Sequence, residues 1–285
     1  MPLSGAIDLH THSSVSDGTE TPGDLVRSAV TAGLSTVALT DHDSTSGWNE
    51  AFEAAAGTGL MVVPGMELST NYGPASVHML AYLFDPHNPE VLEETERIRD
   101  GRMHRAERIV ERISKDYGIT WADVLAQSTD GGTIGRPHIA DALVAHGDVP
   151  DRSAAFQTIL HWKSGYYEKY YAPSPLVGVR MITAAGGVPV LAHPATHGRY
   201  RVIEDDAIEE LVDAGLFGLE IHHRDNTEDG KARLYELAAK FGLQVTGSSD
   251  YHGDGKPNRL GENTTEPAVL EKLIAAGTGS HPFQG

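Results

Sequence analysis

The chain has 285 residues, of which 40% are hydrophobic and 22% charged, enough apolar material for one large core or a core with a small subdomain. It contains no cysteine. Disulfides, thiolate metal sites and a cysteine nucleophile are therefore excluded, and a metal ion must be held by nitrogen and oxygen ligands. The formal net charge of −18 disfavours long nucleic acids as partners, whereas a deep metal site could still bind a small phosphate.

The first ten residues, MPLSGAIDLH, lack the basic region and long apolar run of a signal peptide. No stretch reaches the roughly 18 uninterrupted apolar residues of a membrane span. We therefore expect a cytoplasmic protein without a membrane partner.

Short apolar runs alternate with helical patterns along most of the chain. These runs predict buried strands at Ala6–Leu9, Thr36–Leu39, Leu60–Val63, Val77–Leu83, Val188–Leu191, Gly218–Ile221 and Gln244–Thr246. The first helix is marked by Thr21 as its cap, Pro22 at its first position and Gly33 after its end. Repeated strand–helix units predict a parallel sheet, open or closed into a barrel.

The segment from about Pro89 to Tyr171 is predicted to be almost entirely helical. Its apolar residues, such as Thr95, Ile98 and Ile109, fall near helical spacing. We expect a helical insertion subdomain over residues 89–171, between two strands of a barrel formed by residues 1–88 and 172–285.

His10 and His12 fall where the first strand should end, and Ser16-Asp17-Gly18 follows them. Alternate residues of a strand point to the same side, so the two imidazoles should converge. The end of a barrel strand is also where β/α barrels carry their active sites. An isolated pair of this kind is more often a solvated strand edge.

Five other predicted strands also carry His, Asp or Glu at or near their ends, which changes that interpretation. Six such strand ends in register indicate a metal site. The candidate ligands are His10, His12, Asp17, His42, Glu67, His78, His193, Asp250 and His252. A zinc site uses about four ligands, so nine candidates suit two or three ions with a bridging carboxylate.

At these residues the sequence resembles the polymerase and histidinol phosphatase (PHP) family of metal-dependent phosphoesterases. The motifs are DLHTHSSVSDGT, ALTDHDS, VPGMELS, LAHP and SSDYHG, and the resemblance extends from about residue 6 to 265. The chain is most similar to small stand-alone members with a helical insertion and a Gly-Arg-Pro-His segment, here Gly135–His138. Those members act on nucleoside 3′,5′-bisphosphates or short oligoribonucleotides and release a nucleoside monophosphate such as AMP.

The resemblance implies a distorted (β/α)7 barrel with three divalent ions, which could be Mn, Fe or Zn, and a metal-bridging hydroxide as the attacking group. It implies that one ion is held by His10, His12, Glu67 and Asp250. A second would be held by Asp17, His42 and His252. A third would be held by His78 and His193, with Glu67 bridging to it.

Four further residues are candidates for substrate contact or catalysis. Arg136 would bind a phosphate through its guanidinium, although a helix start before Pro137 explains it as well. His138 could face the same pocket or the core, and the Ser13 hydroxyl could bind phosphate or form a turn. His197 is the candidate general acid, with a metal-bound water as the alternative.

The segment Arg97–Lys115 is rich in arginine, but interleaved acidic residues make a solvated helix face the default; guidance of a phosphate into the site is the alternative. The tyrosines near 166–171 could stack on a base or pack the insertion. Asp8, Asp41 and Asp43 are expected to support or cap rather than to ligate, and Glu220 to be structural.

Two departures from the family pattern concern the substrate pocket: His222-His223-Arg224 stands where relatives more often have Tyr and Pro, and the stretch after Pro194 is atypical. The alternatives to a nucleotide phosphoesterase are a histidinol-phosphate-type phosphatase, an amidohydrolase-like hydrolase and a non-catalytic nucleotide- or metal-binding module. The amidohydrolase is disfavoured because no lysine stands at a predicted strand end as a carbamate bridge.

Overall fold

The computed structural model describes residues 5–129, 132–196 and 203–285. Its sheet has the strand order β1-β2-β3-β4-β5-β6-β7. The strands are β1 (Ala6–Thr11), β2 (Leu34–Leu39), β3 (Met61–Tyr72), β4 (Ala75–Tyr82), β5 (Val188–Ala192), β6 (Gly218–His222) and β7 (Gln244–Gly247). All seven predicted strands are present, and a short strand that was not predicted, β8 (Phe283–Gln284), pairs with β3.

The sheet curls until its two edges nearly meet. His12 N–H donates to the carbonyl oxygen of Tyr251 at 2.8 Å, and Thr11 forms an isolated bridge with Tyr251. These contacts join the end of β1 to the segment after β7. The distorted seven-stranded barrel that the family resemblance implied is confirmed.

The expectation of a parallel sheet is wrong for β4, which runs antiparallel to both β3 and β5. Only Gly73 and Pro74 connect β3 to β4, and so short a connection can only form a hairpin. Gly73 has a φ of +57°, a backbone region that favours glycine. The hairpin also lengthens β3 beyond its predicted end, so Glu67 lies within the strand rather than at its end.

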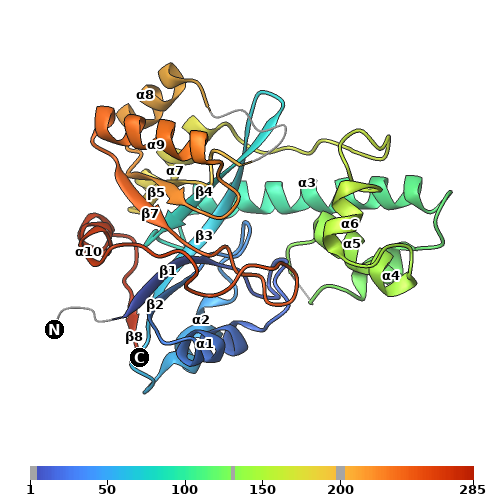
Figure 1. Ribbon diagram of the computed structural model, residues 1–285, viewed down its shortest axis with the longest axis horizontal. Coiled ribbons are helices and arrows are strands. Elements are labelled where there is room, and N and C mark those ends of the chain that lie inside the picture. The colour runs from blue at the N-terminus through green and yellow to red at the C-terminus, as the bar shows by residue number, and fades with distance from the viewer. Residues whose placement is uncertain (1–4, 130–131, 197–202) are drawn as a thin grey trace.

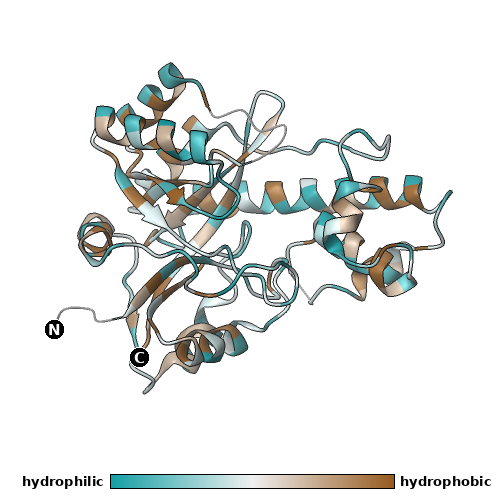
Figure 2. Ribbon diagram, in the orientation of Figure 1, coloured by the Kyte–Doolittle hydropathy of each residue, from teal (hydrophilic) through white to brown (hydrophobic). Residues whose placement is uncertain are grey.

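Helices cover the outside of the barrel (Figure 1). They are α1 (Pro22–Thr31), α2 (Trp48–Ala55), α7 (Pro175–Ala184), α8 (Asp205–Asp213), α9 (Glu228–Phe241) and α10 (Pro267–Ala276). The predicted start of α1 is confirmed, because the Thr21 side chain accepts from Asp24 N–H and Pro22 follows. Figure 2 shows apolar residues along the barrel strands, where Leu9, Val63 and Val190 are buried.

The insertion stands at one side of the barrel, joined to it through the long helix α3 (Figure 1). Its helices are α3 (Pro89–Ile113), α4 (Trp121–Leu125), α5 (Arg136–His146) and α6 (Arg152–Gln157). Residues 158–174 form no helix or strand, so the expectation of an almost wholly helical insertion is wrong there.

The insertion has a hydrophobic core of its own, in which Ile109 of α3 packs with Ile139 and Leu143 of α5. The first half of α3 instead contributes Val91 and Ile98 to the barrel core. Helix α3 therefore belongs to both cores, and the division at residue 89 stays a prediction. Among the described residues, no helix is long and apolar enough to span a membrane.

Candidate metal centre

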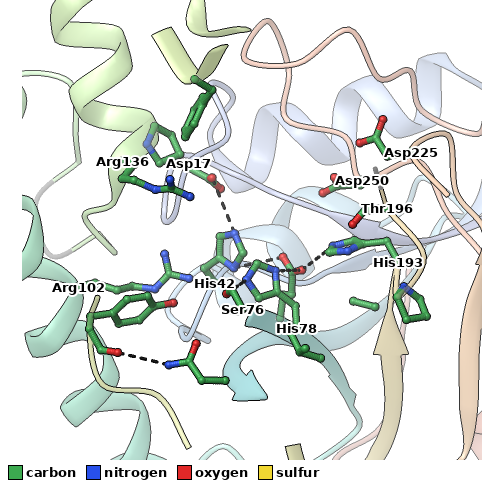
Figure 3. Close-up of a pocket in the computed structure, with 18 of the residues that line it drawn as sticks. Asp17, His42, Ser76, His78, Arg102, Arg136, His193, Thr196, Asp225 and Asp250 are labelled. Atoms are coloured by element: carbon green, nitrogen blue, oxygen red, sulfur yellow. Dashed lines mark hydrogen bonds and ion pairs between the residues drawn. The ribbon is translucent and has the colours of Figure 1, made fainter. Parts of the chain in front are cut away.

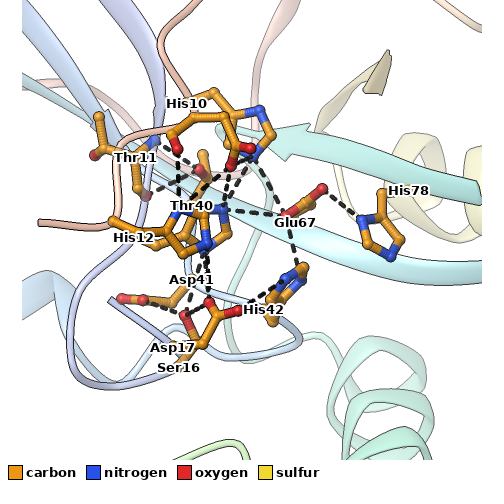
Figure 4. Close-up of polar contacts among 12 residues, drawn as sticks. His10, Thr11, His12, Ser16, Asp17, Thr40, Asp41, His42, Glu67 and His78 are labelled. Atoms are coloured by element: carbon orange, nitrogen blue, oxygen red, sulfur yellow. Dashed lines mark hydrogen bonds and ion pairs between the residues drawn. The ribbon is translucent and has the colours of Figure 1, made fainter. Parts of the chain in front are cut away.

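All nine predicted ligands gather at one end of the barrel; Figure 4 shows His10, His12, Asp17, His42, Glu67 and His78 among them. Most of them follow the carboxyl ends of parallel strands, and the β3–β4 hairpin supplies Glu67 and His78. Glu67 is at the middle of the cluster: its Oε1 lies 2.7 Å from His78 Nδ1 and 3.1 Å from His193 Nε2. One buried carboxylate therefore faces imidazoles from several strands.

The first group of ligand atoms comprises His10 Nε2, His12 Nε2, Glu67 Oε2 and Asp250 Oδ1. The two imidazole nitrogens are 3.0 Å apart, and each lies 3.1–3.5 Å from both carboxylate oxygens. Ligands at about 2.1 Å from a tetrahedral ion are about 3.4 Å from one another. The spacing of these four atoms therefore fits a single ion.

A second group comprises Asp17, His42, His252 and again His12. His252 Nε2 lies 3.1 Å from Asp17 Oδ1, and His42 Nε2 lies 3.8 Å from Asp17 Oδ2. Within the described part of the chain, His252 Nε2 is buried without a hydrogen bond. Such an atom facing a carboxylate is an arrangement that a cation would complete.

The third group differs in part from the set that the resemblance implied. His78 and Glu67 form a group with His42, whereas His193 forms one with His10 and Glu220. His193 still contacts Glu67 through its Nε2. All nine candidate ligands are brought together. Their division among ions differs from the implied one, because His42 falls in two of the groups and His193 groups with His10 and Glu220.

The charges of the cluster favour a cation. Burial alone would lower the pKa of His12, but its contacts with Asp250 and Glu67 raise that pKa to about 9. Burial opposes ionisation of Glu67 as well, yet the surrounding imidazoles of His42 and His78 hold the pKa of Glu67 well below its usual range. In the metal-free protein, the carboxylates therefore keep an imidazole protonated. A metal ion would have to displace that proton in order to bind.

Buried carboxylates that are not themselves predicted ligands hold the segments after β1 and β7 in place. Asp41 accepts hydrogen bonds from Ser13 N–H at 2.8 Å and from the Ser13 and Ser16 hydroxyls at 2.6 Å each. Asp8 accepts from the N–H groups of Ser249 and Gly261. The predicted supporting role of these aspartates agrees with this geometry.

A cavity of about 430 Å³ opens over the cluster. Ligand side chains such as Glu67, His78 and Asp250 line one part of it. Arg102 and Arg136 point toward the cluster from the side away from Asp250 and His193 (Figure 3). The further basic residues of the lining are Arg105, Lys169 and Lys256. Arg102 and Arg136 thus lie across the cavity from Asp250 and His193 (Figure 3), whereas Lys256 contacts the cluster itself through Asp250.

The predicted substrate residues are only partly brought to this cavity. Arg136 lines it and lies over the rings of Phe156 and Tyr167. Ser13 is buried and donates to Asp41, and His138 is buried with its Nδ1 accepting from Gly135 N–H; neither is in the cavity lining. His197 lies outside the described residues.

Arg102 and Arg105 are buried, whereas the acidic residues interleaved in Arg97–Lys115 predicted a solvated helix face by default. Arg102 donates to Ser69 Oγ at 2.6 Å and pairs with Asp43 at 2.9 Å. The signal was present, because Ile98, Arg102, Arg105 and Ile109 follow one another at intervals of four, three and four residues. The two arginines occupy the apolar stripe of α3.

Lys256 was also missed. Its Nζ lies 2.7 Å from Asp250 Oδ2, four residues beyond His252 in the loop that follows β7. His223 approaches the same carboxylate oxygen, with Nε2 at 3.4 Å. The loop position of Lys256 carried no local pattern that could have identified it.

Comparison with known proteins identifies the relatives of this chain. Residues 8–130 match the family model described as the PHP domain. The chain is 32% identical over 276 residues to a 3′,5′-nucleoside bisphosphate phosphatase of Chromobacterium violaceum, covering 94% of each chain. It is 33% identical over 260 residues to a 5′-3′ exoribonuclease of Haemophilus influenzae, covering 90% of this chain and 93% of that one.

A crystal structure from Bifidobacterium adolescentis, provisionally described as a metal-dependent phosphoesterase, has the same fold. It superposes with a TM-score of 0.94 at 44% identity and covers 98% of both chains. These relatives are described as phosphoesterases, which favours a phosphoesterase over an amidohydrolase and over a non-catalytic module. With the clustered ligands, they show that the chain belongs to the PHP family and is a metal-dependent phosphoesterase.

Proposed function

We propose that the enzyme hydrolyses a phosphate ester of a small nucleotide. The substrate would be a nucleoside 3′,5′-bisphosphate, giving a nucleoside 5′-monophosphate such as AMP and phosphate, or a short oligoribonucleotide. The observation that carries the proposal is a cavity with a metal-ligand cluster on one side and buried arginines on the other. A molecule with two phosphate groups matches those two surfaces.

The nine clustered residues would hold two or three divalent ions. Their imidazole and carboxylate donors suit Mn, Fe or Zn. When bound, the ions would make hydroxide available near neutral pH and neutralise charge on the phosphate. Glu67 would be shared between ions, because both of its oxygens face imidazoles. Glu220 would orient His10 through the Nδ1 atom that does not face the cluster.

Arg105 is the strongest candidate for binding the second phosphate. Its side chain is 5% exposed overall and lines the cavity. Among the described residues, Arg105 Nε has no hydrogen-bond partner. Burial lowers the pKa of Arg105 to about 9. A phosphate would satisfy this buried donor and stabilise its charge, and Arg102 and Arg136 would contribute from either side.

A nucleoside would fit between the two phosphate positions. The rings of Phe156, Tyr167 and Tyr170 and the apolar Pro137 line the cavity beside the arginines. Two of the four tyrosines in the 166–171 segment have other partners: Tyr166 donates to Asp116 in the turn after α3, and Tyr171 donates to Glu94 on α3. Tyr167 and Tyr170 are therefore the proposed stacking surface for a base.

A substrate panel tests the proposal. Metal-loaded enzyme would be given a nucleoside 3′,5′-bisphosphate, a 5′-phosphorylated dinucleotide, a cyclic nucleotide, histidinol phosphate and p-nitrophenyl phosphate, and phosphate and nucleotide products would be measured. We expect the first two to have the highest kcat/KM. A preference for histidinol phosphate, or equal rates on all five, would contradict the proposed substrate class.

A further inference from the structure

The insertion contacts the two loops that carry Asp17 and His42. Thr133 Oγ1 donates to the carbonyl oxygen of His42 at 2.9 Å. Its backbone N–H donates to the carbonyl oxygen of Val15, also at 2.9 Å. One threonine, in the segment between α4 and α5, therefore ties together the loop after β1 and the loop after β2.

Arg152, at the start of α6, makes a second connection. Its Nη1 donates to the carbonyl oxygen of Asp17 at 2.8 Å, while Nε and Nη2 donate to the two carboxylate oxygens of Asp141 on α5, both at 2.5 Å. A two-point pair of this kind fixes the plane of a guanidinium. The third nitrogen is thereby aimed at the Asp17 peptide.

These connections join the insertion, which has its own hydrophobic core, to loops of the barrel. Ile139 and Leu143 of α5 are anchored in the insertion core, and Thr129 adds a bond from its hydroxyl to the Ser14 carbonyl oxygen at 2.7 Å. The insertion therefore contributes directly to holding the loop that carries Asp17.

The other ligands are held differently. His10 lies on β1 and Glu67 on β3, so the hydrogen-bonded ladder of the barrel fixes their backbones. His193 follows β5 directly and donates its backbone N–H to Glu220 on β6. Asp17 lies in a turn, where such a ladder does not reach. Its loop is held from the barrel by Asp41, which accepts from Ser13 and Ser16, and from the insertion by Arg152, which donates to the Asp17 carbonyl oxygen.

We propose that the helical insertion clamps the metal position formed by Asp17, His42 and His252 and sets its affinity separately from the other positions. The clamp consists of Thr133, Asp141 and Arg152. This inference rests on the metal assignment proposed above. Groups that orient metal ligands typically change metal affinity by about 10- to 100-fold when they are removed, so the clamped position should respond on that scale.

The test is a metal titration of clamp variants. Thr133→Val removes the hydroxyl at nearly constant volume, and Arg152→Met removes all three donated bonds while keeping the length of the side chain. Matched controls are Thr158→Val and Arg112→Met, whose side chains bond within the insertion. Each metal-free protein is titrated with Mn²⁺, and bound metal per chain is measured by mass spectrometry after gel filtration.

We expect both clamp variants to bind one ion about 10- to 100-fold more weakly than wild type, with the remaining ions unchanged. Thr133→Ser, which keeps the hydroxyl, should restore wild-type binding, and the two controls should titrate like wild type. Thermal unfolding of the metal-free proteins checks that they are folded. If Arg152→Met fails to fold, the Thr133 pair carries the test alone.

Two results would overturn the clamp: an unchanged titration of a folded Thr133→Val variant, or an equal weakening of every ion. Either failure leaves the wild-type titration intact. A wild-type chain that binds no ion would instead contradict the metal assignment itself, and the clamp with it. Because metal content is the readout, substrate choice does not enter the result.

Discussion

Glu220 Oε1 lies 3.0 Å from Nδ1 of His10, and both side chains are fully buried. The other oxygen of Glu220 accepts the backbone N–H of His193 at 2.9 Å. With Nδ1 held in this way, Nε2 of His10 faces Glu67 and Asp250. A single carboxylate on β6 thus orients predicted ligands from two other strands. Burial opposes its ionisation, but the neighbouring His10 holds the pKa of Glu220 below its usual value.

Glu220→Gln should lower metal affinity by about 10- to 100-fold. Glutamine has one acceptor oxygen, so it cannot accept from both His10 Nδ1–H and His193 N–H, and its amide would oppose one of these donors. Calorimetric titration of the metal-free protein measures the change. Glu228→Gln, at an exposed pair with Lys231, is the control; equal affinities in both variants would argue against an orienting role.

His78→Ala should remove one ion per chain and most of the phosphoesterase activity. His78 contacts one oxygen of Glu67, whereas His10 and His12 contact the other. The ion held by His10 and His12 should therefore be retained. Metal analysis and phosphate release measure the two effects. Exposed His104 provides the matched His104→Ala control. Unchanged metal content and activity in His78→Ala would refute a three-ion centre.

Metal affinity should rise with pH up to about 9. The carboxylates around His12 raise its pKa to about 9, so below that pH the metal-free protein holds a proton that an ion must displace. One displaced proton weakens binding by about tenfold for each unit of pH below 9. Titrations in buffers of different ionisation enthalpy would report the proton released. A pH-independent affinity with no proton release would contradict this competition.

Arg105→Met should lower kcat/KM for a nucleoside 3′,5′-bisphosphate by about 10- to 150-fold, because a charge-assisted hydrogen bond contributes about 1.5–3 kcal/mol. The rate on p-nitrophenyl phosphate, which has no second phosphate, should change little. Arg108→Met on the same helix alters an exposed side chain and serves as the control. An equal loss on both substrates would show that Arg105 does not act on a second phosphate.

Much of the fold was predictable because its signals are local. Apolar runs of strand length identified all seven barrel strands, and Thr21 with Pro22 identified the start of α1. The direction of β4 was not predicted, because the two-residue connection at Gly73 and Pro74 becomes visible only once β3 is known to extend to Tyr72. Length and spacing of a run report burial but not strand direction.

The sequence by itself determined the set of metal-ligand candidates, because side-chain chemistry at the ends of recognisable strands is written locally. Only the tertiary structure decided what supports those residues. Glu220 reaches His10 across 210 positions of the chain, and Arg152 reaches Asp17 across 135. Contacts at such separations depend on how the barrel closes and how the insertion is seated, and no periodicity within a segment encodes either.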